Sequence, residues 1–333
     1  MNQHVLAPPV ALLLPGQGAQ YRRMGAALHG YDRVFTEVMD EFLELLGADG
    51  ERLRELWLTG EPADGVHDGL NAQPLLFGVA YAAAKSLEHR GLRPAVLLGH
   101  SIGELCAATL AGVWDLPAAA RILAARSSSL GKAPRGGMLA VAAALDTVEP
   151  LIPAECARAG VAVGAVNGAA QTVLAGPEAE LAATDAVLKA KGMTTRAVRT
   201  AQPFHSPAMA EAARVFQEAI AAEQRNSPAI PLVSSLTAEP VTEQQALDPG
   251  FWASQMSRPV LFWPALQALD RRGAHTYVEV GPGKGLAAAA RRLPTVLEGS
   301  SRVVSTLPSE RGDTVATWES ALAALASAGH LAG

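Results

Sequence analysis

The chain has 333 residues, of which 49% are hydrophobic and 18% charged, and its formal net charge is −5. This length is ample for a buried core, and the two cysteines cannot form a disulfide framework. The acidic balance argues against a nucleic-acid-binding protein, and no apolar run is long enough to span a bilayer. We therefore expect a cytoplasmic globular protein without a metal site that binds neither nucleic acid nor membrane.

Strand-like and helical segments alternate in the first part of the chain. The pattern predicts strands at Val10–Leu14 and Ala95–Leu98 and helices at Asp32–Leu46 and Leu75–His89. Such alternation indicates an α/β protein with a parallel sheet. The carboxylate of Asp32 is expected to cap its helix by accepting a hydrogen bond from an amide of the first turn.

The rhythm changes after residue 137, where strands and helices follow the order β-α-β-β-α-β. This order is typical of a ferredoxin-like unit. The expected elements are a strand at Met138–Ala142, a helix near Val148–Ala159, strands at Val161–Val166 and Thr172–Ala175, a helix at Pro177–Lys191 and a strand near Thr194–Val198.

Alternating α/β character resumes after this unit, with strands expected at Ile230–Ser234 and Thr276–Val280 and a final helix at Val315–Ala328. The small unit therefore has the position of an insertion. We predict a large α/β-hydrolase-like domain made of residues 1–134 and 202–333, and an inserted ferredoxin-like subdomain at residues 135–201. A substrate site is expected in the cleft between them.

The sharpest local motif is Gly99-His100-Ser101-Ile102-Gly103, which follows the predicted strand Ala95–Leu98 and precedes a helical pattern at Glu104–Ala111. A G-x-S-x-G sequence between a strand and a helix is typical of a nucleophile elbow. The tight turn exposes the serine hydroxyl, and the helix N-terminus favours negative charge beside it. Ser101 is thus the candidate nucleophile.

A serine nucleophile needs a base, and histidine is the usual base near neutral pH. The sequence has eight histidines. His205 lies in a loop just after the predicted insertion returns to the large domain, so its position favours it over the others. His100 adjoins Ser101 but is expected to point elsewhere on the turn.

At this point the motifs together resemble a known family, the malonyl-CoA:acyl carrier protein transacylases, and most of all the acyltransferase domains of modular polyketide synthases. The likeness runs from about Leu12 to Arg292. Besides the elbow, it rests on these motifs: Leu14 to Gln20 (LPGQGAQ), Ala165 to Gly168 (AVNG), Phe204 to Pro207 (FHSP), Pro231 to Ser235 (PLVSS), Arg258 to Val260 (RPV) and Glu279 to Gly283 (EVGPG).

The resemblance implies a role for each matching catalytic position. Ser101 would carry the acyl group as an ester, and His205 would act as base and then as acid. A backbone carbonyl of Gln255 or a close neighbour would orient the imidazole in place of a carboxylate. The backbone amides of Gln17 and Ile102 would form the oxyanion hole.

The resemblance also implies the substrate class. Arg126, 25 residues after Ser101, would hold the free carboxylate of a malonyl-type group. Phe204 would crowd an α-substituent, and Asn167 and Gln202 would contact the substrate. Family members selective for malonyl usually read His-Ala-Phe-His at the histidine loop, whereas this chain has glutamine and proline in the first two places, so a substituted malonyl or a pathway-specific acyl chain stays open.

Acyl-CoA is the implied donor, and the phosphopantetheine arm of an acyl carrier protein on a separate chain is the implied acceptor, with no permanently bound cofactor. The expected setting is polyketide biosynthesis by a freestanding, trans-acting enzyme. Three alternatives remain: transfer of a pre-assembled acyl unit between carrier proteins, hydrolysis of acyl carrier proteins, and a catalytically silent carrier-binding module. A basic rim is expected to help the carrier dock, with these pairs as candidates: Arg22/Arg23, Arg271/Arg272 and Arg291/Arg292.

Overall fold

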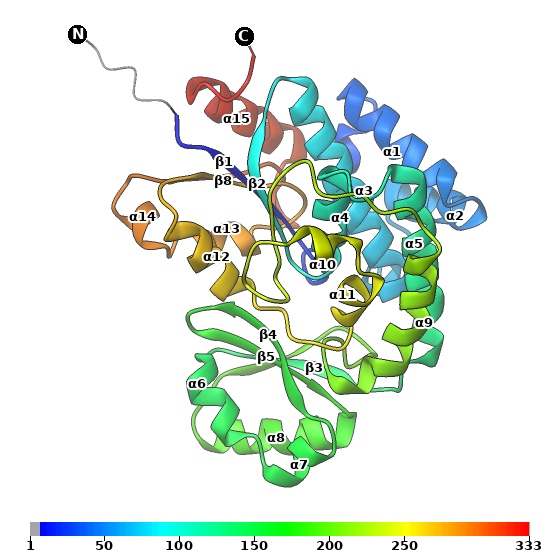
Figure 1. Cartoon of the computed structure of the whole chain (residues 1–333), viewed down its shortest axis with the longest axis vertical. Coiled ribbons are helices and arrows are strands. Elements are labelled where there is room, and N and C mark those ends of the chain that lie inside the picture. The colour runs from blue at the N-terminus through cyan, green and yellow to red at the C-terminus, as the bar shows by residue number, and fades with distance from the viewer. Residues whose placement is uncertain (1–6, 333) are drawn as a thin grey trace.

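The computed structural model describes residues 7–332 and contains two β-sheets of different kinds (Figure 1). The larger sheet has five strands, and each neighbouring pair is parallel. Its order is β7 (Leu232–Val233), β2 (Pro94–Gly99), β1 (Val10–Leu14), β8 (Thr276–Glu279) and β9 (Arg302–Ser305). The predicted α/β class with a parallel sheet is confirmed.

The central strand β1 is buried along its whole length because helices cover both faces of the sheet. Leu12 and Leu14 pack into a core with α1, α3, α4 and α5, whereas Ala11 and Leu13 pack on the other side with α12 and α13. The alternation follows the two-residue period of a strand. It explains why the sequence here is a continuous apolar run.

The helices of the large domain come both before and after the inserted unit in the sequence. Those that precede the unit are α1 (Arg33–Leu45), α2 (Ala48–Thr59), α3 (Gly69–His89), α4 (Ile102–Leu110) and α5 (Leu116–Ser129). Those that follow it are α9 (Ala210–Ala221), α10 (Glu243–Leu247), α11 (Pro249–Ser254), α12 (Phe262–Asp270), α13 (Gly285–Ala290), α14 (Pro294–Leu297) and α15 (Thr314–Ser327).

The smaller sheet is antiparallel throughout, with the order β4-β5-β3-β6. Its elements are β3 (Gly137–Val141), α6 (Leu145–Val148), α7 (Ala154–Arg158), β4 (Ala162–Gly168), β5 (Gln171–Gly176), α8 (Glu178–Ala190) and β6 (Thr195–Val198). The predicted ferredoxin-like arrangement is confirmed. Figure 1 shows this sheet at the lower end of the molecule, with α6, α7 and α8 on its outer side.

The two faces of the small sheet have different environments. Leu139 and Val141 of β3 pack with Leu174 of β5 and with the helices α7 and α8. Met138 and Ala140, which alternate with them, line a cavity on the opposite face. One face therefore forms a small core, and the other is available as a wall for a ligand.

Several elements differ from the sequence-based expectation. The helix expected near Val148–Ala159 is broken into α6, a 3-10 turn at Glu149–Leu151 and α7, because Pro150 and Pro153 lack the amide that a continuous helix needs. Helix α3 begins at Gly69, earlier than expected, and contains Pro74. The sequence pattern does not predict helix α2 or strand β9.

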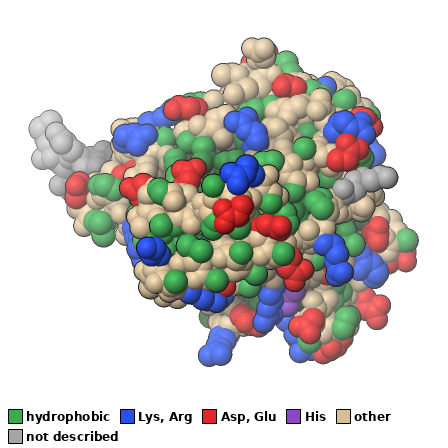
Figure 2. Space-filling model, turned by 90° about the horizontal axis from the view of Figure 1, so that it is seen from below, with side chains coloured by type: hydrophobic (Ala, Val, Ile, Leu, Met, Phe, Trp, Pro, Cys, Tyr) green, Lys and Arg blue, Asp and Glu red, His purple; other side chains and the backbone are tan. Residues whose placement is uncertain are grey.

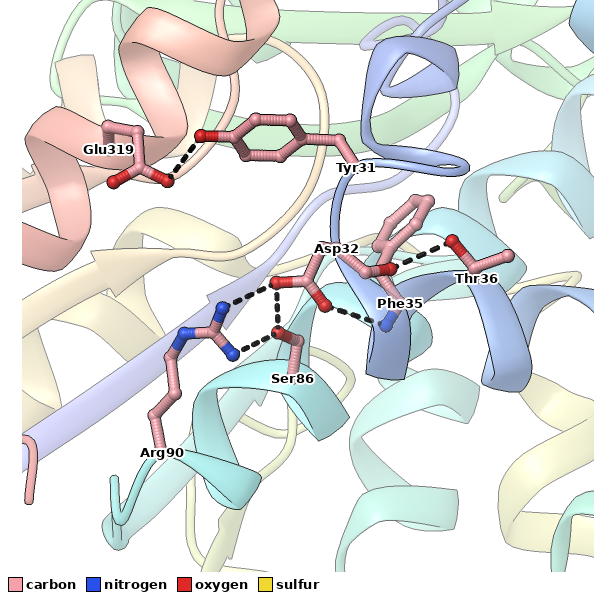
Figure 3. A network of polar contacts seen from close by, with 7 residues as sticks. All are labelled: Tyr31, Asp32, Phe35, Thr36, Ser86, Arg90 and Glu319. Atoms are coloured by element: carbon pink, nitrogen blue, oxygen red, sulfur yellow. Dashed lines mark hydrogen bonds and ion pairs between the residues drawn. The ribbon is translucent and has the colours of Figure 1, made fainter.

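The predicted cap at Asp32 is confirmed and belongs to a wider polar network (Figure 3). One carboxylate oxygen of Asp32 accepts an amide of the first turn of α1, and the other accepts the Ser86 hydroxyl and pairs with Arg90 at 2.8 Å. The adjoining Tyr31 donates to Glu319 on α15 at 3.1 Å. The network ties the start of α1 to the end of α3 and to the last helix.

Over the described part of the chain, none of the helices combines the length and the apolar character needed to traverse a bilayer.

Candidate active site

Ser101 occupies the sharp bend between β2 and α4, with φ 53° and ψ −118°. A non-glycine residue at positive φ is strained, and such strain persists only where the surrounding structure enforces it. A Cβ on Gly99 would overlap the backbone of Gly103, and a Cβ on Gly103 would overlap the carbonyl of Leu14. The two glycines thus let the strand, the bend and the helix pack against each other as the G-x-S-x-G motif predicts.

His205 reaches Ser101 from a loop that is distant in sequence. Its Nε2 lies 2.8 Å from the Ser101 Oγ, and its Nδ1 lies 2.7 Å from the carbonyl oxygen of Gln255 and 3.2 Å from that of Arg258. A carbonyl only accepts, so Nδ1 carries the proton and Nε2 is free to accept from the serine. His205 also has positive φ, 63°, and its amide donates to the Met256 carbonyl at 2.8 Å.

The environment of His205 keeps its imidazole neutral. Burial is the largest cause, followed by the positive charge of Arg126 and the proximity of His100, and together they lower the pKa of His205 to about 3. The hydrogen bonds to the two backbone carbonyls act in the opposite direction and do not offset these causes. At neutral pH the ring is therefore unprotonated and able to take the Ser101 proton.

The backbone amides of Gln17 and Ile102 are the donors predicted for the oxyanion hole. Ile102 is the first residue of α4, so its amide is one of the unpaired donors at a helix N-terminus. Gln17 lies in a turn closed by a hydrogen bond from the Ala19 amide to the Gly16 carbonyl at 3.3 Å. Within residues 7–332, the structure records no acceptor for either amide, which leaves both able to stabilise an oxyanion.

A cavity of about 500 Å³ lies between the two sheets, and Ser101 and His205 open into it. Its large-domain wall includes the turn at residues 15–21 and the loop at residues 283–286. The wall from the small sheet consists of alternating residues of its four strands: Met138, Ala140, Ala165, Asn167, Gln171, Val173, Arg196 and Val198. The expected cleft between the two units is therefore present.

His100 and Asn167 connect the two walls. The Nε2 of His100 lies 2.7 Å from the Oδ1 of Asn167 on β4, and the His100 ring packs near Phe262 with 5.7 Å between ring centres. Both His100 and Asn167 line the cavity. His100 therefore bonds across the cleft to Asn167 and takes part in the cavity wall.

Arg126 is buried next to the rings of Phe204 and Phe216. The Arg126 side chain is 3% exposed, its guanidinium carbon is 5.7 Å from the ring centre of Phe204 and 6.0 Å from that of Phe216, and its Nη1 donates to the Oε1 of Gln73. Phe204 lines the cavity, whereas Arg126 does not. Burial lowers the pKa of Arg126 to about 10, so the group stays charged at neutral pH. No carboxylate of the described residues forms an ion pair with it.

Gln202 is half-buried beside the histidine loop but does not line the cavity. The backbone amide of Gln202 donates to the Thr200 hydroxyl at 3.3 Å, and Thr200 lines the cavity. The arginine pairs expected to form a basic rim do not line the cavity either. Among the described residues, the charged side chains that do line it are Arg196, Lys284, Glu279 and Glu310. Figure 2 shows basic and acidic side chains interspersed on the end of the molecule seen there.

Two buried glutamates support the loops around the site. Glu104, on α4, accepts from the amide of Ser235 at 3.1 Å and from its hydroxyl. Glu279 accepts the amides of Leu286 and Ala287 at 3.1 Å and 2.8 Å. Burial raises the pKa of each carboxyl to about 7. In the region from residue 7 to 332, no three metal-ligating side chains are grouped to hold a metal ion.

Sequence reasoning missed Gln73, Gln171, Arg196 and Lys284. The last three face the cavity because of strand alternation and loop position. Gln73 had no signal beyond the Gln-Pro pair inside a helical pattern, since its partners are 53 and 56 residues away in sequence. The structure brings together Ser101, His205 and the Gln255 carbonyl.

Comparisons with known proteins agree with this geometry. Residues 12–330 match the family described as "Acyl transferase domain". Over 288 residues the chain is 37% identical to the spectinabilin polyketide synthase system protein NorB of Streptomyces orinoci, covering 85% of this chain and 13% of that protein. It is also 36% identical to erythronolide synthase EryA2 of Saccharopolyspora erythraea, covering 81% of this chain and 8% of that one. The chain thus spans only a small part of the length of these relatives.

Solved structures give the same result. The acyltransferase domain from the second module of the salinomycin polyketide synthase superposes with a TM-score of 0.87 at 34% identity, over 96% of this chain and 73% of that one. FabD from Acinetobacter baumannii superposes with a TM-score of 0.85 at 29% identity, over 97% and 99% of the two chains.

The fold and these similarities define an acyltransferase enzyme. The chain belongs to the acyl transferase family that includes the acyltransferase domains of modular polyketide synthases and the malonyl-CoA:acyl carrier protein transacylases.

Proposed function

We propose that this enzyme transfers a malonyl-type acyl group from coenzyme A to the phosphopantetheine thiol of an acyl carrier protein through an ester on Ser101. The observation that carries the proposal is a strained serine at hydrogen-bond distance from a neutral histidine, with a buried guanidinium nearby that has no carboxylate partner among the described residues. The first pair supplies nucleophile and base. The guanidinium supplies a preference for an acyl group that bears its own carboxylate.

The chemistry proceeds in two halves. In the first, the Ser101 oxygen attacks the thioester carbonyl while the His205 Nε2 takes its proton, the amides of Gln17 and Ile102 stabilise the oxyanion, and the proton passes to the departing coenzyme A thiol. In the second, the carrier thiol gives its proton to His205 and attacks the ester, and Ser101 recovers its proton on leaving. The Gln255 carbonyl holds the ring in the required tautomer.

The substrate class follows from the charge of Arg126. A buried cation without a counter-ion is unfavourable, and a carboxylate delivered by the acyl group would supply one in bidentate form. Phe204 lines the cavity and contacts Arg126, which does not line it, so we propose that the malonyl carboxylate passes the edge of this ring. The ring would also disfavour an α-substituent, although one methyl group changes selectivity by only about 1–3 kcal/mol.

The acceptor and the setting are proposed from the cavity wall and from the relatives. The wall formed by the small sheet is apolar over Met138, Ala140 and Val173 and polar at Asn167 and Gln171, which suits the alternating alkyl and amide groups of a phosphopantetheine arm. Polyketide biosynthesis is proposed from the relatives named above. We propose that the carrier protein is a separate chain.

Intact-protein mass spectrometry after exposure to a mixture of acetyl-, malonyl- and methylmalonyl-CoA tests the proposal. We expect a malonyl adduct on Ser101 that disappears when a phosphopantetheine-bearing carrier protein is added and reappears as malonyl-carrier. Rapid loss of the adduct to water without a carrier would instead identify a hydrolase. An adduct formed equally well from acetyl-CoA would contradict the proposed substrate class.

A further inference from the structure

Gln73 on α3 contacts both Arg126 and the turn that carries Gln17. Its Oε1 accepts from the Nη1 of Arg126, and its Nε2 donates to the Oε1 of Gln17 at 3.1 Å. Gln73 is 3% exposed. One amide side chain therefore bridges the buried cation and the turn that carries Gln17, a proposed oxyanion-hole residue.

The hydrogen-bonding groups of the Gln73 side chain explain why a glutamine suits the position between Arg126 and Gln17. A glutamine presents one acceptor and two donors, so it can satisfy a cation on one side and an acceptor on the other. A glutamate would neutralise the guanidinium permanently, and an apolar residue would leave it without the contact. Gln73 orients Arg126 while leaving its positive charge and its other four donors for an incoming group.

The second contact has a matching consequence for the turn at Gln17. The Oε1 of Gln17 accepts its hydrogen bond from Gln73. A carboxylate that binds Arg126 would change the contact on the other side of the same Gln73 side chain. The two contacts therefore form a continuous path from Arg126 to the turn that carries Gln17.

We propose that Gln73 is a positioning residue that keeps Arg126 available for the acyl carboxylate and couples its occupation to the placement of Gln17. This inference rests on the proposed function and extends it, because it states how the enzyme favours a carboxylate-bearing acyl group in rate as well as in binding. Gln73 touches no reacting atom and acts through its two partners.

The test measures the rate of Ser101 acylation from malonyl-CoA and from acetyl-CoA in the full chain. In Gln73→Glu the new carboxylate occupies Arg126, so malonyl loading falls about a hundredfold while acetyl loading falls much less. In Gln73→Met both contacts are lost, and kcat for malonyl falls more than KM changes. Asn71→Leu, on the same helix and bonded instead to Arg52 and Gly65, is the matched control and keeps the wild-type malonyl-to-acetyl ratio.

A double-mutant cycle tests the coupling. Because Gln17→Met and Gln73→Met remove the same hydrogen bond, the double variant should be no slower than Gln73→Met alone. Losses that multiply, or a Gln73→Glu enzyme that keeps its malonyl preference, would overturn the inference. A wild-type enzyme that malonyl-CoA does not acylate would instead refute the proposed function, so the two failures are distinguishable. Thermal melting confirms that each variant is folded.

Discussion

The large sheet and the small sheet contribute to the cavity in different ways. The large domain holds the reacting pair, Ser101 and His205, and both residues have positive φ. Backbone carbonyls of Gln255 and Met256 accept hydrogen bonds from the ring and the amide of His205. The small sheet contributes Met138, Ala140 and Val173 from regular strands, where alternation alone turns them to the cavity. Strained backbone therefore positions the chemistry, and unstrained backbone shapes the space for the substrate. Substitutions in the first region should change rates, and those in the second should change which groups fit.

Replacing the nucleophile gives the largest expected effect. Ser101→Ala removes the hydroxyl that His205 would deprotonate, so the acyl adduct should be absent at any incubation time. Intact-protein mass spectrometry measures it. Ser309→Ala, in the same cavity, should still be acylated. An adduct that persists in Ser101→Ala would place the nucleophile elsewhere.

The second expected effect concerns Arg126→Gln. Malonyl loading should fall about a hundredfold because the buried carboxylate loses its partner. Arg126 also lowers the pKa of His205, second only to burial, so its removal should raise that pKa. The imidazole of the variant then becomes protonated at a higher pH than that of the wild type. The acid limb of kcat/KM for acetyl-CoA should therefore move to higher pH.

Arg121→Gln is the matched control for Arg126, because Arg121 lies on the same helix and pairs at the surface with Glu223. Its pH profile and malonyl preference should remain those of the wild type. An unchanged acid limb in Arg126→Gln would show that its charge does not reach the histidine.

A pair of glycine substitutions compares the effect on stability at the strained bend with that in the small sheet. Gly103→Ala forces a methyl group against the Leu14 carbonyl and should lower the free energy of unfolding by about 3 kcal/mol. In Gly137→Ala in β3 the new methyl group meets only Leu181 at 3.5 Å, an ordinary contact. This substitution should change the free energy of unfolding by less than about 1 kcal/mol. Urea denaturation measures both. Equal losses would contradict the distinction between the two regions.

The last expected effect is the pH dependence of stability from Glu104, which appears only across a pH range. Its pKa in the folded protein is raised from 4.5 to about 7 by burial, so the folded state binds more protons than the unfolded state between these values. The free energy of unfolding should therefore fall as pH rises through that window. In Glu104→Gln the fall should be smaller by on the order of 3 kcal/mol. Glu178→Gln on the exposed start of α8 should leave the wild-type slope.

The sequence predicts features that depend on local pattern and misses those that depend on distant contacts. The bend at Ser101 follows from glycine spacing between a strand and a helix, and the cap at Asp32 follows from its place before a helix. Strand β9 lies at the sheet edge and is only partly buried, so its apolar pattern is weak. The bridge made by Gln73 joins residues more than fifty positions apart, which no local pattern encodes.

The alternation of strand β3 has a practical consequence for library design. Met138 and Ala140 face the cavity, whereas Leu139 and Val141 face the small core. A mutational scan along this strand, sorted separately for expression and for acyl-group choice, should give two interleaved sets of sensitive positions. Randomising only the cavity-facing set would vary the substrate repertoire while leaving the hydrophobic packing beneath the sheet untouched.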